Sequence, residues 1–584
     1  MFLFECSSSE ISQIIKEFEN GKASDLPIVV LKKCANLISG HLSGFINYFM
    51  KLGVFPKILK LGKVTPVYKK GDAQTFDNYR PISIIPIFGK IFEKIIYSRL
   101  YSFLVTNSVI YDKQFGFRKF HSTGHAINYS VNKIVSETQQ RNHVLGIFID
   151  LSKAFDTIDH NKMIAKLEHY GIRSTALKLL SNYLKNREQY TYFKGIDSQT
   201  CEVNFEVPQG SVLGPLLFLL YINDIANSSV DGNFVLFADD TNIFVIGQNE
   251  EVVYARAQNV LNQVDQYMVS NQLQINLTKS VFIHFKPNFK QSERQTCART
   301  RIEKSLKISN FKLKRVTKVK FLGVMIDDKL TWEAQIEYLK EKLLSSIVVI
   351  KRIKKFIPES EYLGLYNSLF KSHISYCISS WGGTSKYKLE KIFSIQKQCI
   401  RILFGNELNF DHAEYYQTCA RARTYQQHIA KKDFTLEHTK PIFNDKKLLI
   451  LHHLYIYHTF LELFKVLKFK SPISICEYFD FSPRVSSMLL TLPKIKNETE
   501  KCNFVFKASS IWNALIDKLL SKCILNSEGI IIPGSVSGSD LSTSISIIKS
   551  KLKDVLLETQ KFDPNTQVGW KKTDEWYREN FFQS

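Results

Sequence analysis

Two adjacent aspartates, Asp239 and Asp240, interrupt an otherwise apolar stretch that reads Phe-Val-Leu-Phe-Ala-Asp-Asp-Thr-Asn-Ile-Phe-Val over residues 234–245. A third carboxylate, Asp150, ends a second apolar run, Val-Leu-Gly-Ile-Phe-Ile-Asp, over residues 144–150. Unpaired carboxylates beside buried strands are unfavourable, because a charge that leaves water needs a compensating partner. A divalent cation is such a partner, and the hard ion Mg²⁺ prefers carboxylate oxygens. Two strands that bring carboxylates to one point are the layout for two-metal phosphoryl transfer, so the pattern predicts a nucleic-acid polymerase.

The residues that follow Asp150 include an aromatic ring and two more acids. A ring at Phe155 beneath the sugar of an incoming nucleotide would exclude a ribose 2′-OH and select deoxynucleotides. The alternative is that Phe155 is an ordinary core residue. We expect Asp156 and Asp159 to be turn or capping residues, because Asp favours helix starts.

A third segment, Val-Pro-Gln-Gly-Ser-Val-Leu-Gly-Pro over residues 207–215, lies between the two acidic strands. Gly210 and Gly214 permit close backbone approach, and a helix that starts at Ser211 would offer its N-terminus. A common turn that leads into a buried helix is the alternative.

Two segments are basic. The first has cations on both sides of a turn, and these are Lys69, Lys70 and Arg80. Such paired cations suit a nucleoside triphosphate, and Arg80 could hold phosphate oxygens bidentately. Residues 299–320 carry nine Lys or Arg and one acid, with apolar residues interleaved, which favours a half-buried surface that presents cations to a nucleic-acid backbone. Solvated basic loops are the alternative for both segments.

The composition agrees with a polyanionic partner. The 584 residues carry a formal net charge of +23, and phosphate is the commonest partner of such an excess of Lys and Arg, although a merely basic soluble surface is the alternative. With 44% hydrophobic and 13% aromatic residues, wholesale disorder is excluded and several domains are expected. The ten cysteines form no Cys-x-x-Cys pair, so the sequence favours reduced thiols over zinc sites or disulfides.

Nothing in the sequence indicates a signal peptide or a membrane span. The start, Met-Phe-Leu-Phe-Glu-Cys, lacks a basic region, and the longest apolar run, near residues 212–222, is shorter than the ~20 residues of a membrane helix. We therefore expect a soluble, intracellular protein without a membrane partner, in either the nucleus or the cytoplasm.

Strands and helices must alternate to position these residues. Hydrophobic periodicity predicts an α+β fold up to residue 330 and helices beyond it. The helices are expected at residues 8–20, 25–50, 88–104, 160–170, 174–186, 211–225 and 252–271, and the strands at 62–69, 144–150, 189–194, 201–207, 234–247, 281–285 and 318–325. After residue 331, an apolar stripe indicates an amphipathic helix, and its members are Trp332, Ile336, Leu339, Leu343 and Ile347. Residues 445–465 and 545–558 are also expected to be helical, with a loop over residues 526–544.

Seven segments, in order across residues 62–325, resemble the reverse transcriptases of non-LTR (LINE-like) retrotransposons, and a weaker likeness extends upstream to about residue 20. These segments are Val-Tyr-Lys-Lys-Gly-Asp with Asn-Tyr-Arg-Pro-Ile-Ser, Gln114-Phe-Gly-Phe-Arg118 with Ser122-Thr123, Asp150-Leu-Ser-Lys-Ala-Phe-Asp, Pro-Gln-Gly-Ser-Val-Leu-Gly-Pro, Phe-Ala-Asp-Asp-Thr, Asn276-Leu-Thr-Lys279 and Phe321-Leu-Gly-Val324.

The resemblance implies a right-hand polymerase with fingers, palm and thumb and a mainly helical C-terminal region. The expected divisions are an N-terminal helical extension (1–60), fingers and palm (61–330), a helical thumb (331–430) and a C-terminal region of unknown role (431–584). Within the last of these, residues 503–513 also look like the C-terminal segment of the family.

The resemblance also implies roles for individual residues. It implies that three carboxylates hold two Mg²⁺ ions, namely Asp150, Asp239 and Asp240. Mn²⁺ is an alternative metal, and Asp240 is the least secure ligand. It implies contacts with the nucleotide by Lys69, Lys70, Arg80, Phe155, Gln209, Gly210 and Lys279. It implies contacts with the template or primer by Arg118, Phe321, Leu322 and Gly323.

The implied partners are an RNA template, a DNA primer and dNTPs. The roughly 60 residues before the first motif are too few for an endonuclease domain, so we expect nicking of target DNA to come from a separate endonuclease. We expect the chain to be a partial product of such an element.

Three other functions stay open. An RNA-templated RNA polymerase is disfavoured because a ribose-accepting site should offer a polar group at Phe155. A group II intron-like maturase is nearer, but the Gln-Gly-Ser-Val-Leu-Gly and Phe-Ala-Asp-Asp-Thr segments favour the LINE-like group. The third is a non-catalytic nucleic-acid-binding protein, domesticated or decayed, on the same fold.

Overall fold

The computed structural model of the chain describes most of its residues and divides it into two compact units. The described residues are 1–152, 154–203, 205–287, 304–405, 439–480, 489–492, 504–523 and 548–558. Unit 1 comprises the described residues of Met1–Lys119, His143–Phe282 and Arg294–Arg315, and unit 2 those of Phe120–Asn142, Ile283–Glu293 and Val316–Ser584. The predicted domain boundaries at residues 60, 330 and 430 stay predictions.

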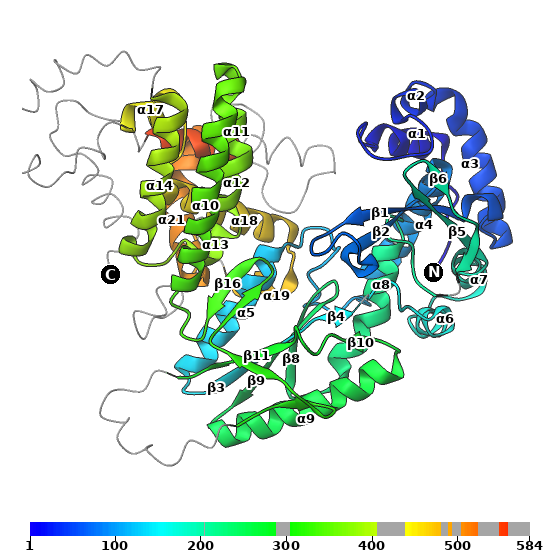
Figure 1. Ribbon diagram of the computed structural model, residues 1–584, viewed down its shortest axis with the longest axis horizontal. Coiled ribbons are helices and arrows are strands. Elements are labelled where there is room, and N and C mark those ends of the chain that lie inside the picture. Colours follow the sequence, from blue (N-terminus) through cyan, green and yellow to red (C-terminus); the bar gives the residue numbers. More distant parts are fainter. Residues whose placement is uncertain are drawn as a thin grey trace, which may run out of the picture. The chain divides into compact units, whose positions relative to one another are not determined.

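Unit 1 begins with a helical layer and a small sheet. Helices α1 and α3 pack together, and α1 also contacts α4 (Figure 1). These helices are α1 (Ser8–Glu17), α2 (Ile28–Lys33), α3 (Ala35–Leu52) and α4 (Ile87–Thr106). In the sheet, β1 pairs antiparallel with β2 and parallel with β5. Its strands are β1 (Leu61–Tyr68), β2 (Tyr79–Ile84), β5 (Arg187–Phe193), β6 (Ile196–Asp197) and β7 (Cys201–Val203).

The second sheet positions the acidic residues. Its order is β14-β11-β3-β9-β8. The strands are β3 (His143–Ile149), β8 (Gly232–Phe237), β9 (Asp240–Gly247), β11 (Val281–Phe285) and β14 (Lys314–Val316). All seven residues of β3 are buried, and α9 (Glu250–Ser270) packs against β3 and β9 (Figure 1). A strand buried on both faces lacks polar alternation, which accounts for the continuous apolar run before Asp150.

The core of unit 1 is built around α8 (Gly214–Ile222), which is buried on all sides. It contacts α6, and α6 contacts α7. The helices are α6 (His160–His169) and α7 (Ser174–Leu184), and Asp159 caps α6 as expected by accepting from the Lys162 backbone N–H. Shorter elements are β4 (Leu151–Ser152), β10 (Gln274–Ile275), β12 (Lys307–Ile308) and β13 (Phe311–Lys312), and the 3-10 turns lie at Lys57–Leu59, Phe76–Asn78 and Asn223–Ser228.

Unit 2 is mainly helical. Its helices α10, α14, α18 and α21 pack in sequence, and α5 contacts α13, α19 and α21. The elements are α5 (Thr123–Gln139), α10 (Glu333–Ile353), α11 (Tyr362–Leu365), α12 (Ser372–Ser375), α13 (Ile378–Trp381), α14 (Lys386–Phe404), α17 (Lys440–Asp445), α18 (Leu451–Phe469), α19 (Ile473–Cys476) and α21 (Phe504–Cys523). A π-helical turn spans Tyr366–Lys371, 3-10 turns lie at Lys354–Phe356 and Glu359–Glu361, and one hairpin pairs β15 (Lys318–Phe321) with β16 (Val324–Asp327).

The predicted α+β fold is confirmed, and so is the helical character beyond residue 331. The stripe from Trp332 to Ile347 is buried along α10. No helix in the described ranges is long and apolar enough to cross a membrane.

Three element predictions were wrong in detail, and one helix was missed. The single helix over 25–50 is two helices that break at Cys34, and the strand over 318–325 is a hairpin. The helix expected from Ser211 begins at Gly214, and the helix Thr123–Gln139 was not predicted. The loop expected over residues 526–544 lies outside the described residues.

Candidate active site

The adjacent aspartates lie at a tight hairpin turn between β8 and β9. Phe237 and Asp240 are the last paired residues, so Ala238 and Asp239 form the turn alone. Two-residue hairpin loops favour a positive φ, and Ala238 adopts a φ of 54°. The hairpin therefore presents Asp239 at its tip and Asp240 at the first position of β9.

The neighbouring strand brings the third carboxylate to the same end of the sheet. Strands β3 and β9 are antiparallel with Ile149 opposite Thr241, so the next residue, Asp150, lies level with Asp240. Residues far apart in the chain thus meet through strand register.

The electrostatics of the three carboxylates are coupled. Burial, then repulsion from Asp239 and Asp150, raises the pKa of Asp240 to about 6. Burial also raises the pKa of Asp239, and Asp150 raises it further, while Arg80 and Lys69 lower it. The predicted triphosphate cations Arg80 and Lys69 therefore lie within electrostatic range of Asp239.

A lysine is paired with Asp150. The Lys279 ammonium lies 3.1 Å from the Asp150 carboxylate, and both side chains are partly exposed. The Asn276-Leu-Thr-Lys279 segment is held in place because the Asn276 N–H donates to the Asp150 carbonyl at 2.8 Å. The Asp150 N–H in turn donates to the Ser280 hydroxyl at 3.2 Å. The structure thus brings Lys279 to the acidic end of the sheet.

The donor atoms of these carboxylates suit a divalent cation, although the three side chains are not grouped tightly around one point. Among the described residues, no three His, Cys, Asp or Glu side chains are grouped closely enough to hold a metal. The donor atoms are all carboxylate oxygens, which suit Mg²⁺. The raised pKa values of Asp239 and Asp240 reflect burial and repulsion, and a bound cation would relieve both.

Phe155 and the Pro-Gln-Gly segment are neighbours. The Phe155 carbonyl accepts from the Val207 N–H at 3.2 Å, and the Gln209 amide nitrogen donates to Asp156 at 2.8 Å. The half-buried Phe155 ring stacks on Phe218, with centroids 4.7 Å apart. The ring is therefore a core residue on one face, which leaves the proposed sugar contact to its remaining surface.

Gly210 is required by close backbone approach. It has a φ of 127°, and an added Cβ would lie 2.4 Å from the Ser83 carbonyl oxygen. The Ser83 N–H also donates to the Gln209 carbonyl at 2.7 Å, which ties the segment to the end of β2.

A buried carboxylate that the sequence reasoning missed supports this segment. Glu93 on α4 accepts from the backbone N–H of Val212 at 2.5 Å and from the Tyr183 hydroxyl at 2.9 Å. Burial raises the pKa of Glu93, and the nearby Arg187 guanidinium lowers it. An acid inside the apolar run of α4 was the only sequence signal for this role.

Arg118, predicted near the template, contacts the backbone of its own loop. One of its nitrogens, Nη1, donates to the carbonyls of Tyr111 at 2.9 Å, Asp112 at 3.4 Å and Gln114 at 3.2 Å. Burial lowers the pKa of the guanidinium. These contacts show a loop-holding role, and a template contact stays a prediction.

The predicted primer-binding turn belongs to unit 2. Leu322 and Gly323 have φ angles of 45° and 87° and reverse the chain between β15 and β16. The Tyr376 hydroxyl donates to the Leu322 carbonyl at 2.7 Å, and an added Cβ on Gly323 would lie 3.0 Å from the Tyr376 ring. Phe321, before the turn, is buried.

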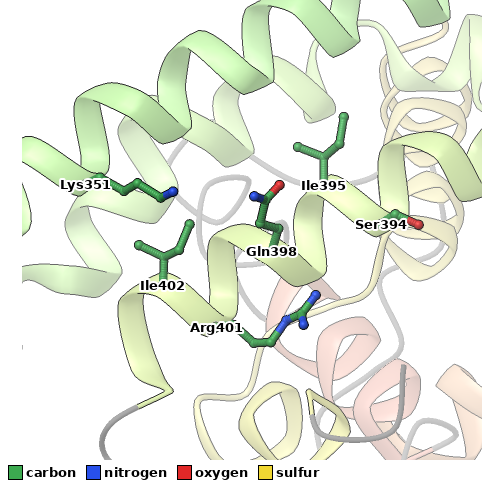
Figure 2. Close-up of a pocket in the computed structure, with 6 residues that line it drawn as sticks. All are labelled: Lys351, Ser394, Ile395, Gln398, Arg401 and Ile402. Atoms are coloured by element: carbon green, nitrogen blue, oxygen red, sulfur yellow. The ribbon is translucent and has the colours of Figure 1, made fainter. Parts of the chain in front are cut away.

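Unit 2 also contains a groove that none of the predicted site residues line. Figure 2 shows Lys351 from α10 facing a row of side chains from α14 across this groove. The cavity has a volume of about 440 Å³ and is lined by Lys351, Ser394, Ile395, Gln398, Arg401 and Ile402. It has cations and an amide but no carboxylate, so it suits an anion rather than a metal ion.

Comparison with known proteins shows what the residues around the site are similar to. The profile of "Reverse transcriptase (RNA-dependent DNA polymerase)" matches residues 67–326, which include all three carboxylates. A protein of the transposon X-element of Drosophila melanogaster, named as a probable RNA-directed DNA polymerase, is 25% identical over 68% of this chain and 44% of its own length. The RNA-directed DNA polymerase from the mobile element jockey of Drosophila melanogaster is 26% identical over 62% of this chain and 40% of its own length.

A solved telomerase from Candida albicans in complex with a fragment of telomeric RNA is also similar. It is 12% identical over 62% of this chain and 65% of that chain, with a TM-score of 0.33, which is too low to support an argument about the fold. This chain spans less than half the length of the two Drosophila relatives. Residues 67–326 therefore match the reverse transcriptase family, and the chain is similar to polymerases of non-LTR retrotransposons.

Proposed function

We propose that the chain is an RNA-directed DNA polymerase that transfers nucleotides from dNTPs to the 3′-OH of a DNA primer on an RNA template. The observation that carries this proposal is the strand register that sets Asp150 level with Asp240, beside the Asp239 turn. This arrangement lies within the residues that match the reverse transcriptase family.

The residues would divide the reaction among them. Asp150, Asp239 and Asp240 would hold two Mg²⁺ ions, or Mn²⁺, which when bound would neutralise charge on the primer oxygen and on the leaving pyrophosphate. The side chains proposed to bind the triphosphate are exposed, and these are Lys69, Lys70 and Arg80. Two of them, Lys69 and Arg80, act electrostatically on Asp239 in the acidic turn.

The remaining residues would set specificity and position. Gln209 and Gly210 are held beside Phe155, which supports contacts of this segment with the nucleotide and template. Lys279, already 3.1 Å from Asp150, would shift toward the leaving pyrophosphate once a cation takes its place at the carboxylate. Arg118 would contact the template, and Phe321, Leu322 and Gly323 the primer terminus.

Primer extension tests this proposal directly. A purified chain should lengthen a DNA primer on an RNA template with dNTPs and Mg²⁺, and a chelator should stop the reaction. Binding of the template and primer without any extension would support the alternative of a non-catalytic nucleic-acid-binding protein. Equal extension with rNTPs would point instead to an RNA polymerase.

A further inference from the structure

The loop Lys113–Gly116 contacts the back of the hairpin turn that carries the aspartates. Gln114 is only 1% exposed, and its side-chain oxygen accepts from two backbone N–H groups. These belong to Gly116 at 2.9 Å and to Ala238, in the turn, at 3.1 Å. The second bond joins residues 124 positions apart in the chain.

Main-chain bonds extend the same contact. The Phe115 N–H donates to the Leu236 carbonyl at 2.8 Å, and the Leu236 N–H donates to the Lys113 carbonyl at 2.9 Å. The loop therefore adds a short parallel bridge to β8, with Gln114 paired to Leu236. This bridge fixes the strand two residues before the turn begins.

Gly116 lets the loop approach the turn. A Cβ at this position would lie 2.2 Å from the Ala238 nitrogen and 2.9 Å from the Phe237 carbonyl carbon. Real Cβ atoms do not approach backbone this closely, so any larger residue would displace the loop or the turn.

The turn itself needs external support. Ala238 is a non-glycine residue in the left-handed region, a conformation that is unfavourable for a residue with a Cβ. Three mutually repelling carboxylates lie at this end of the sheet. A turn with strained backbone and like charges would relax unless neighbouring groups held it.

We propose that Gln114 and Gly116 are positioning residues that hold the Ala238-Asp239 turn in the geometry needed for catalysis. They act through the turn backbone and touch no reacting group. This inference rests on the proposed polymerase activity, and it assigns the Gln-Phe-Gly segment to support of the carboxylates rather than to contact with template.

The decisive variants are Gln114→Met, which removes the acceptor at similar volume, and Gly116→Ala, which adds the clashing Cβ. The matched control is Asn223→Leu. Asn223 is a buried amide that braces the same loop three residues earlier, accepting from the Tyr111 N–H and donating to the Val109 carbonyl, both at 2.8 Å. Both of these bonds go to the loop backbone and neither goes to the turn, so Asn223→Leu reports on loop stability.

The measurement is single-turnover extension at saturating dNTP, which separates the rate constant from the fraction of active enzyme. We expect both variants to lower the rate constant about tenfold or more with nearly unchanged amplitude, since small misplacements of reacting groups are that costly. Asn223→Leu should stay within about twofold of wild type in rate constant. The inference would be overturned if Gln114→Met and Gly116→Ala lowered the amplitude but left the rate constant unchanged. It would also be overturned if Asn223→Leu lowered the rate constant equally.

Hydrogen exchange at the Ala238 amide gives a second readout that needs no activity. Gln114→Met should accelerate this exchange by about tenfold or more, because the amide loses its acceptor. If the wild-type protein never extends a primer, the proposed function fails. The exchange rate alone then tests whether Gln114 holds the turn. Unchanged exchange would contradict it.

Discussion

The aromatic ring of Phe155 packs against the core on one face, and we propose that its remaining surface contacts the nucleotide. Its contact with Phe218 fixes the ring, and its edge-to-face neighbour Phe117 lies with centroids 6.3 Å apart. A fixed ring is a good steric filter, because it cannot move aside for a ribose 2′-OH.

Phe155→Val should therefore admit ribonucleotides. We expect the preference for dNTP over rNTP, measured as a ratio of kcat/KM values, to fall by about tenfold or more. Phe117→Val is the control, since Phe117 is 49% exposed and contacts the same ring without forming the gate. Unchanged discrimination in Phe155→Val would remove this residue from the gate.

Glu206 lies next to the Pro-Gln-Gly segment, and its raised pKa should make the stability of the protein depend on pH. Burial and then Asp156 raise the pKa of Glu206 to about 7, from 4.5 as an ordinary side chain. The folded protein therefore retains a proton that the unfolded chain releases, so this group lowers stability as pH rises from 4.5 through 7. Glu206→Gln should raise the free energy of unfolding by about 1–2 kcal/mol at pH 8 and change it little near pH 4.

Denaturant titrations at several pH values would check this expectation. Glu202→Gln is the control, because Glu202 is an exposed acid on the neighbouring strand β7. A Glu206→Gln variant that destabilises the protein at pH 8 would contradict the assigned direction.

At the scale of elements, the position of the Pro-Gln-Gly segment depends on a buried network between α4, α7 and β5. Glu93, Tyr183 and Arg187 are each at most 2% exposed, and Arg187 donates to the Tyr183 carbonyl at 3.2 Å. A carboxylate at the start of α8 is favourably placed, because the N-terminal N–H groups of a helix lack internal partners.

A double-mutant cycle tests this network. Glu93→Leu alone should lower the free energy of unfolding by about 3–5 kcal/mol, because the buried Arg187 guanidinium loses a nearby carboxylate and the Val212 N–H loses its acceptor. Combined with Arg187→Leu, the total loss should be smaller than the sum of the single losses. Additive losses in chemical denaturation would show that the two charges are uncoupled.

Some of these elements could be predicted from sequence and others could not. The apolar run before Asp150 and the hairpin around Asp239 follow from strand patterns, because each strand is buried over most of its length. Helix α5 was not predicted, because many of its buried residues are polar, among them Asn128, Ser130 and Asn132. An apolar stripe is harder to recognise in such a helix, because polar residues interrupt its buried face.

The long-range contacts could not be predicted from the sequence either. Nothing local indicates that Gln114 bonds to Ala238 or that Glu93 bonds to Val212, since each pair is separated by more than one hundred residues. Lys279 beside Asp150, by contrast, was anticipated near the leaving pyrophosphate through the resemblance to reverse transcriptases.

At the scale of the whole molecule, we expect the excess of positive charge to govern the proposed binding of nucleic acid. The formal charge of +23 is spread over both units, with Lys307, Lys312, Lys314 and Arg315 in unit 1 and the Lys351–Arg401 groove in unit 2. Of the predicted basic segment 299–320, residues 299–303 lie outside the described residues.

RNA binding should accordingly depend steeply on salt. Affinity should fall about a hundredfold between roughly 50 and 200 mM salt, which corresponds to about five neutralised phosphates on a single strand. Filter-binding or anisotropy titrations would measure this slope. A fall of less than about fivefold would mean that the charge is not used for phosphate contacts.

We propose that Asp150, Asp239 and Asp240 act together as the catalytic carboxylates, and primer extension by Asp239→Asn tests this shared role. The substitution keeps the size of the side chain but removes its charge. We predict that extension on an RNA template falls by about a thousandfold or more while the Kd for the RNA template stays within about threefold of wild type. An Asp239→Asn variant that extends primers at the wild-type rate, or that loses RNA binding and extension equally, would contradict the account.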